Sequence, residues 1–265
     1  SIGMIQAARE IEEQTPGEVA FIYFGERDFD APVSLEPTSI DRKFWKTFLS
    51  VTLDDIAKLI APKVVVLCEG NPRGTRRNNF DAACLTTVLG SEMPDIEFIS
   101  VGSSTEVQND RLRIGEAITG LVPGTEVIRL IDRDDMNEDE IQERRDLGIR
   151  VLSRRQLESY LWDDAVLEKL CREERKEELI PDVLAAKETA LRDSAYRGNP
   201  VDDIKSAAGS AYSEIKRILQ LTQCGGTVDA FMKGVLSPLV TADMEVYQEL
   251  KRDIFGQALN PDEDN

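Results

Sequence analysis

A short apolar segment that ends abruptly in charged residues limits what this chain can form. The run Val127–Ile131 is followed at once by Asp132, Arg133, Asp134 and Asp135. Alternate side chains of a strand share a face, so Asp132 and Asp134 are expected to point the same way. Carboxylates at the end of a buried strand are costly unless a cation satisfies them, and hard divalent metals take oxygen ligands. The pattern indicates a metal site, with Asp135 expected to continue the loop.

Strand-like and helix-like segments alternate through this part of the chain. The β-branched and apolar composition predicts strands at 64–68, 96–101, 126–131 and 149–152, and the pattern predicts helices at 80–89 and 138–147 with a weaker one at 105–119. Asn137 and Glu140 have the spacing of a capping box at the start of the second helix. Such alternation is typical of an α/β fold with a mainly parallel, Rossmann-like sheet and helices on both faces.

Acidic residues occupy two of the predicted strand ends. Glu69 follows the strand at 64–68, and Asp132 and Asp134 follow the strand at 126–131. Taken alone, Glu69 could cap a helix, and the two aspartates could be solvated loop acids. Sites in open parallel sheets lie beyond the carboxyl ends of the strands. The shared position therefore favours one common site.

Composition excludes several classes of chemistry. The 265 residues contain no histidine, so Ser-His-Asp hydrolysis and ordinary His-zinc sites are excluded. The net charge of −18 argues against general nucleic-acid binding, although metal ions, a local basic patch or a further domain could supply the attraction. The scattered cysteines Cys68, Cys84, Cys171 and Cys224 predict free thiols in a cytoplasmic protein. The sequence contains no run of about 18 apolar residues, so no membrane span is predicted.

Three segments together resemble a Toprim domain. They are Val-Val-Val-Leu-Cys-Glu-Gly at 64–70, the Asp-Arg-Asp at 132–134, and Gly148–Leu161, which contains Ser-Arg-Arg-Gln-Leu-Glu-Ser-Tyr-Leu. Over about residues 62–165 the chain is similar to the Toprim half of the overcoming-lysogenisation-defect (OLD) family of ATP-dependent nucleases. The resemblance implies a metal-dependent DNA endonuclease with two Mg²⁺ or Mn²⁺ ions. It also implies that Glu69, Asp132 and Asp134 are catalytic metal ligands.

One position departs from the family pattern. Many OLD-type sequences have a second acid soon after Glu-Gly, whereas this chain has Arg73 four residues after Glu69. Asp81 is the candidate replacement, although an acid in a first helical turn also suits the helix dipole. Glu158 is either a distal ligand or a helix N-terminal acid. Ser103, beyond the second strand, is a further candidate for contact with metal or phosphate.

Basic residues offer candidate contacts to DNA. Arg73, Arg76 and Arg77 are expected to contact phosphate or to form a solvated loop. Lys205 either stabilises charge in the transition state or pairs with neighbouring acids such as Asp202 and Asp203.

The predicted organisation has three parts. Residues 1–61 resemble the tail of a preceding ATPase-like region with a linker helix, residues 62–165 form the Toprim catalytic domain, and residues 166–265 are mostly helical. The chain has no Gly-x-x-x-x-Gly-Lys-[Ser/Thr] motif and so no P-loop ATP site of its own. The expectation is a C-terminal fragment of a longer ATPase–nuclease. Its expected partners are DNA, an ATPase domain and possible further copies of itself, with anti-phage defence as the implied setting.

Three other functions fit parts of the pattern. One is a Toprim module of topoisomerase or primase type, but the five tyrosines have no distinguishing context. Another is a receiver-type phospho-acceptor, which normally needs paired acids after its first strand. The third is a non-catalytic assembly module, favoured by the acidic charge and by Arg73.

Overall fold

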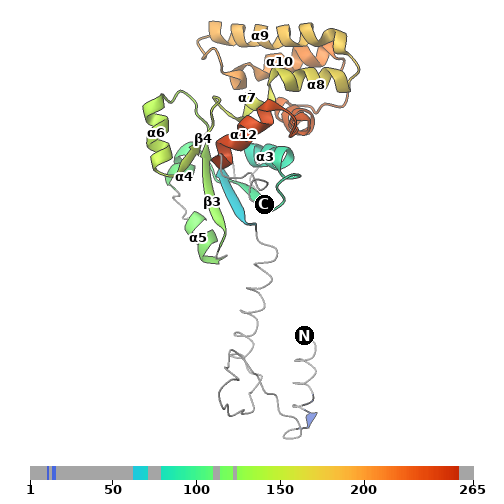
Figure 1. Ribbon diagram of the computed structural model, residues 1–265. Helices are drawn as coiled ribbons and strands as arrows, with labels where there is room; N and C mark the ends of the chain where they lie inside the picture. The colour runs from blue at the N-terminus through green and yellow to red at the C-terminus, as the bar shows by residue number, and fades with distance from the viewer. Residues whose placement is uncertain are drawn as a thin grey trace, which may run out of the picture. The chain divides into compact units, whose positions relative to one another are not determined.

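Four parallel strands in the order β2-β1-β3-β4 form the sheet (Figure 1). They are β1 (Val64–Cys68), β2 (Ile96–Ser100), β3 (Glu126–Ile131) and β4 (Ile149–Val151). β1 pairs with both β2 and β3, and β3 pairs with β4. The parallel sheet confirms the predicted α/β, Rossmann-like class, and it brings the carboxyl ends of β1 and β3 side by side.

The computed structural model describes residues 62–70, 79–109, 114–121 and 124–256, together with residues 11, 14 and 15. The chain divides into two compact units, Ser1–Ala61 and Pro62–Asn265. The predicted ATPase-like tail, the loop containing Arg73, Arg76 and Arg77, and the acidic end of the chain lie outside the described residues.

The two faces of the sheet belong to two hydrophobic cores. On one face, Val65, Leu67 and Ile131 pack with residues of α4, α5 and α6. On the other face, Val66 and Leu130 pack with α3 and with the helices that follow β4. Strands buried on both faces explain why these segments are continuously apolar rather than alternating. The prediction of helices on both faces is therefore confirmed.

The helices between the strands follow the predicted pattern with one difference. They are α3 (Phe80–Leu89), α4 (Ser104–Asn109), α5 (Ile114–Leu121) and α6 (Glu138–Asp146). Asn137 caps α6, and its side chain and that of Glu140 bond to each other's backbone N–H groups in a capping box. The single weak helix predicted at 105–119 is instead two short helices, α4 and α5.

A helical region follows β4. It contains α7 (Leu157–Leu161), α8 (Asp164–Glu173), η1 (Glu177–Leu179), α9 (Ile180–Tyr196), α10 (Ile204–Ile218), α11 (Val228–Phe231), η2 (Met232–Leu236), η3 (Ser237–Leu239) and α12 (Glu245–Phe255). Aromatic rings pack between these helices. The ring centroid of Phe231 lies 5.8 Å from that of Trp162 and 5.1 Å from that of Tyr212. Because the same core reaches Val66 in β1, this region and the sheet share one hydrophobic interior.

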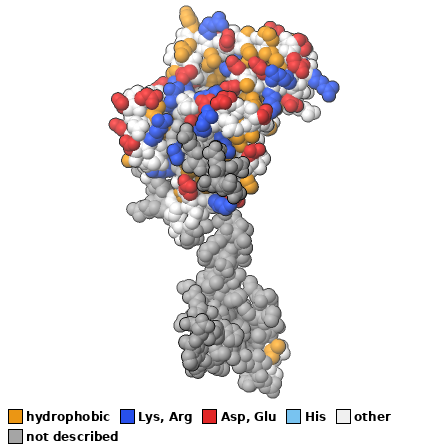
Figure 2. Space-filling model, viewed as in Figure 1, with side chains coloured by type: hydrophobic (Ala, Val, Ile, Leu, Met, Phe, Trp, Pro, Cys, Tyr) orange, Lys and Arg blue, Asp and Glu red, His pale blue; other side chains and the backbone are white. Residues whose placement is uncertain are grey.

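The four cysteines are buried free thiols, as predicted. Burial raises the pKa of the Cys84 thiol to about 12, so it stays protonated at neutral pH. On the face in Figure 2, acidic and basic side chains are interspersed over the described residues. Within the described ranges, every helix is too short or too polar to cross a bilayer.

Candidate metal centre

Glu69 and Asp132 meet where neighbouring strands end. β1 and β3 pair in register, with Leu67 opposite Arg129, so the residues after each strand emerge at the same edge. The backbone N–H of Asp132 donates to Oε1 of Glu69 over 3.1 Å. The sequence-predicted pair is therefore in direct contact.

Asp132 is a buried carboxylate, with 7% of its surface exposed. Its Oδ1 accepts a 3.2 Å hydrogen bond from the backbone N–H of Leu157, at the start of α7. Burial, followed by the charges of Asp81, Glu69 and Glu158, raises its pKa well above the ordinary range, although Lys205 opposes this. The protein concentrates negative charge here without enough positive charge to balance it.

Glu158 brings a third carboxyl group from α7. It is 3% exposed, and its Oε1 lies 3.0 Å from Nζ of Lys205. Its Oε2 is buried and has no hydrogen-bond partner among the described residues. A buried carboxylate oxygen without a donor is costly, so this atom marks a position where a cation or a donor would be stabilising.

Asp81 completes the cluster from the first turn of α3. The residue is half-buried, and it lines the same small cavity as Glu69 and Asp132. Burial raises the pKa of Asp81 to about 8, with further increases from Glu158 and Glu69 and opposing effects from Lys205 and Lys233. The pKa of Glu69 is also raised, first by burial and then by Asp134 and Glu158. Such mutual effects mean that the acids lie within electrostatic reach of one another.

Asp134 and Asp135 lie at the rim. Asp134 is exposed and takes a left-handed backbone conformation with φ of 47°, while its N–H donates to the carbonyl of Arg155. The chain turns at Asp134 and leaves the extended conformation of β3. The alternation of side chains that was expected to point Asp132 and Asp134 the same way therefore does not continue. Asp135 forms a 2.5 Å ion pair with Arg155, which agrees with the expectation that it belongs to the loop.

Two glycines bring the ends of β1 and β2 together. Gly70 N–H donates to the carbonyl of Gly102 over 2.8 Å, and both residues have left-handed φ values, 105° and 129°. A Cβ on Gly70 would stand 3.0 Å from Oγ of Ser100, a buried residue that the sequence did not single out. The role of Gly70 is thus close backbone packing beside Glu69.

Ser103 has a structural partner. Its backbone N–H and its hydroxyl donate to Oε2 of Glu106, at 2.7 Å and 3.1 Å. These bonds hold the first turn of α4. The hydroxyl that the sequence offered as a metal or phosphate contact is used here within the protein.

The donor chemistry of the cluster fits a hard divalent cation, but the present spacing does not surround one. Glu69, Asp81, Asp132 and Glu158 supply only oxygen donors, which Mg²⁺ and Mn²⁺ prefer. Among the described residues, no group of three or more acidic or cysteine side chains is arranged to hold a metal ion. The cavity between Glu69, Asp81 and Asp132 is about 10 Å³, which is roughly the room for one water. Side chains must therefore rearrange to hold two ions.

A larger hollow lies elsewhere. It has a volume of about 580 Å³ and is lined by α9 and α10, with none of the clustered carboxylates in its lining. Its walls carry small side chains such as Ala186 and Ser210. This hollow is therefore separate from the carboxylate cluster.

The helical region holds Glu158 and Lys205 in place through polar bonds that the sequence did not predict. Arg155 pairs with Asp202 at 3.2 Å, and Arg133 pairs with the same carboxylate at 3.3 Å. Gln156 donates to Asp203, the residue that caps α10, over 3.0 Å. Because Lys205 is in the first turn of α10, these bonds fix the position from which its ammonium reaches Glu158.

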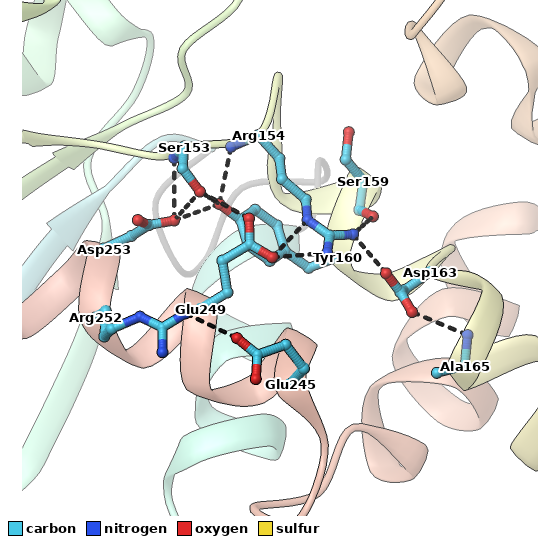
Figure 3. A network of polar contacts seen from close by, with 10 residues as sticks. All are labelled: Ser153, Arg154, Ser159, Tyr160, Asp163, Ala165, Glu245, Glu249, Arg252 and Asp253. Atoms are coloured by element: carbon cyan, nitrogen blue, oxygen red, sulfur yellow. Dashed lines mark hydrogen bonds and ion pairs between the residues drawn. The ribbon is translucent and has the colours of Figure 1, made fainter.

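A second network fixes the loop after β4 against α12 (Figure 3). Oδ2 of Asp253 accepts hydrogen bonds from Tyr160 and from both the hydroxyl and the N–H of Ser153. Arg154 binds Glu249 and Asp163, each at 2.7 Å. Burial and then Asp253 raise the pKa of Tyr160, so its hydroxyl remains a donor. In the sequence, the adjacent arginines Arg154 and Arg155 were the only sign that this loop forms ion pairs.

The structure brings together five of the residues predicted from the sequence: Glu69, Asp81, Asp132, Glu158 and Lys205. Asp134 lies at the rim of this cluster, and the hydroxyl of Ser103 is bonded to Glu106. No protein-family model matches the chain, and a search of curated proteins finds no significant match.

Proposed function

We propose that residues 62–256 form the catalytic part of a metal-dependent DNA endonuclease. The observation that carries the proposal is the contact between Glu69 and Asp132, with Glu158 and Asp81 within electrostatic reach at the carboxyl edge of a parallel sheet. Sites of open α/β sheets form at this edge. Four acids whose like charges repel one another must either take up protons, as their raised pKa values indicate, or bind cations. A ligand of positive charge would relieve this repulsion at neutral pH.

Glu69, Asp132 and Glu158 are proposed to hold the divalent ions, with Asp81 as a further ligand and Asp134 contributing from the rim. Mg²⁺ or Mn²⁺ would supply Lewis-acid chemistry here, activating water and offsetting the charge of the phosphate. The N–H groups of Asp132 and Leu157 orient two of the carboxylates. Lys205, whose side chain is 58% exposed, is proposed to stabilise negative charge that develops on the phosphate.

The chain is further proposed to work as the nuclease part of a longer ATPase–nuclease, with DNA and an ATPase domain as partners. The motif similarity at 64–70, 132–134 and 148–161 supports this assignment. Arg73, Arg76 and Arg77 remain candidates for contact with DNA.

A second candidate is a non-catalytic assembly module. It is favoured by one observation, that one carboxylate oxygen of Glu69 and one of Asp132 already accept hydrogen bonds from backbone N–H groups within the protein. In that case the acids would stabilise the fold or bind a partner protein instead of binding metal.

Incubation with supercoiled plasmid in Mg²⁺, Mn²⁺ or EDTA separates these functions. The expected result is nicked or linear DNA in metal only, with at least a 100-fold slower rate for Asp132→Asn, since even groups that only orient metal ligands contribute 10–100-fold. Asp139→Asn is the matched control, because Asp139 is exposed in the first turn of α6. Relaxed, covalently closed product would indicate a topoisomerase. Absence of product in every metal would favour the assembly module.

A further inference from the structure

A helical segment of unusual geometry passes beside the acidic cluster. η2 (Met232–Leu236) is a π-helical turn, inserted between α11 and the 3₁₀ turn η3. Met232 and Leu236 are buried and anchor the segment in the core. Single π turns are rare and recur at functional sites, because the extra residue changes the direction of the side chains. In this segment the residue next to the Met232 anchor is Lys233.

Lys233 reaches the first turn of α3. Its Nζ lies 5.7 Å from the centroid of the Phe80 ring, within range of a cation–π contact. Phe80 immediately precedes Asp81, and the charge of Lys233 lowers the pKa values of both Asp81 and Cys84. The ammonium is therefore in electrostatic reach of the site.

Most other lysines of the described structure have polar partners. Lys205 pairs with Glu158, and similar partners serve Lys63, Lys169, Lys176 and Lys187. Lys233 and Lys251 differ, since no described residue accepts a hydrogen bond from them or forms an ion pair with them. Of these two, Lys233 is the one whose charge acts on Asp81. One side of its ammonium contacts the Phe80 ring, while its three N–H donors have no acceptor among the described residues.

We propose that Lys233 is a phosphate-binding residue, which contacts a backbone phosphate of the nucleic-acid strand held at the carboxylate cluster. This inference rests on the proposed function and adds a positively charged contact to the acidic site. A lysine gives phosphate a compact point charge. The Phe80 ring positions that charge without neutralising it, unlike the carboxylate that pairs with Lys205.

Salt-dependent DNA binding by the whole chain tests the inference. A labelled duplex is titrated in Ca²⁺ at several KCl concentrations, with gels to verify that the DNA is intact. Loss of one phosphate contact reduces the slope of log K against log salt by about 0.9, which corresponds to roughly eightfold weaker binding in 0.1 M salt. Lys233→Met is expected to show both effects, and Lys233→Arg is expected to retain the wild-type slope. Lys63→Met is the control, because Lys63 precedes β1 at the opposite edge of the sheet.

A Lys233→Met chain that folds normally and keeps the wild-type affinity and slope would overturn the inference. So would a wild-type chain that shows no salt-dependent binding. The two proposals fail separately: a chain that binds with the expected slopes but never cleaves contradicts the nuclease alone. Conversely, metal-dependent cleavage with an unchanged slope for Lys233→Met contradicts only the phosphate contact.

Discussion

The backbone N–H of Asp132 donates to the carboxylate of Glu69 across 3.1 Å, although 63 positions separate the two residues. The bond exists because β1 and β3 are parallel neighbours that end at the same edge. It keeps two acidic residues close to each other, so that their negative charges repel. Every member of the cluster adds to that repulsion, which is the physical reason to expect cations at this edge.

Stability in the absence of metal should fall as the pH rises. The pKa of Asp81 is about 8 in the folded chain, against an ordinary value near 4, so the folded state binds the proton more tightly. The contribution is fully favourable below pH 4 and is lost through the window from about pH 4 to 8. Asp81→Asn should therefore be more stable than the wild type at pH 8 by on the order of 2 kcal/mol, and the gain should shrink towards pH 4. Urea unfolding in EDTA at both pH values measures this, and a pH-independent difference would contradict it.

Metal should reverse that loss. Cations that bind only the folded state stabilise it by mass action, by about 2.7 kcal/mol at 100 times the dissociation constant. The melting temperature at pH 8 should therefore rise with Mn²⁺, and the increase should be smaller at pH 5, where protons compete for the carboxylates. An equal increase at both pH values would indicate binding at other, unperturbed acids.

Lys205 should stabilise the fold through Glu158. Lys205→Met leaves the buried Glu158 without its cation, and because Lys205 itself is largely exposed the expected loss is about 1–2 kcal/mol. Adding Glu158→Gln removes the unpaired charge and should restore most of the stability. Urea unfolding of both single variants and the double variant measures the coupling. Simple additivity of the two effects would refute the pairing.

The network in Figure 3 should stabilise the loop that leads to Glu158. Asp253→Ala removes the acceptor for Tyr160 and Ser153, with an expected loss of about 2 kcal/mol in the free energy of unfolding. Glu245→Ala is the matched change on the same helix: Glu245 is exposed and pairs only with Arg252 among the residues in Figure 3, so its loss should cost less than about 1 kcal/mol. Equal losses would mean that the network adds nothing beyond an ordinary surface ion pair.

Gly70 and Gly209 should respond in opposite directions to alanine. Gly70 has a φ of 105° and approaches Ser100, so Gly70→Ala should cost about 1–3 kcal/mol. Gly209 lies exposed within α10 with open space around it, so Gly209→Ala should stabilise by about 0.5–1 kcal/mol. Denaturation of the two variants tests whether backbone conformation, rather than glycine as such, sets the requirement at Gly70.

The sheet could be predicted because its strands are short, apolar and separated by recognisable helices. Strand ends can be recognised locally, so the sequence alone could assign Glu69 and Asp132 to one common site. The cap of α6 was also predictable, since Asn137 and Glu140 act over three residues. In contrast, one helix was predicted where α4 and α5 form, because weak periodicity does not show an interruption.

Contacts from distant segments could not be predicted. Nothing local links Arg155 to Asp202 or Ser153 to Asp253, because these pairs depend on how the helical region packs on the sheet. Lys233 was missed for the same reason, and a π turn has no distinctive sequence pattern. The left-handed turn at Asp134 also altered the expected alternation after β3.

Direct titration with Mn²⁺, followed by electron paramagnetic resonance of the free ion, tests whether the carboxylate cluster is a metal site. The expected result is Mn²⁺ binding by the wild-type chain at pH 8 that Asp132→Asn weakens at least tenfold. The Asp139→Asn control should bind as the wild type does. No binding by the wild type, or equal binding by the wild type and Asp132→Asn, would contradict a metal centre built on Glu69 and Asp132.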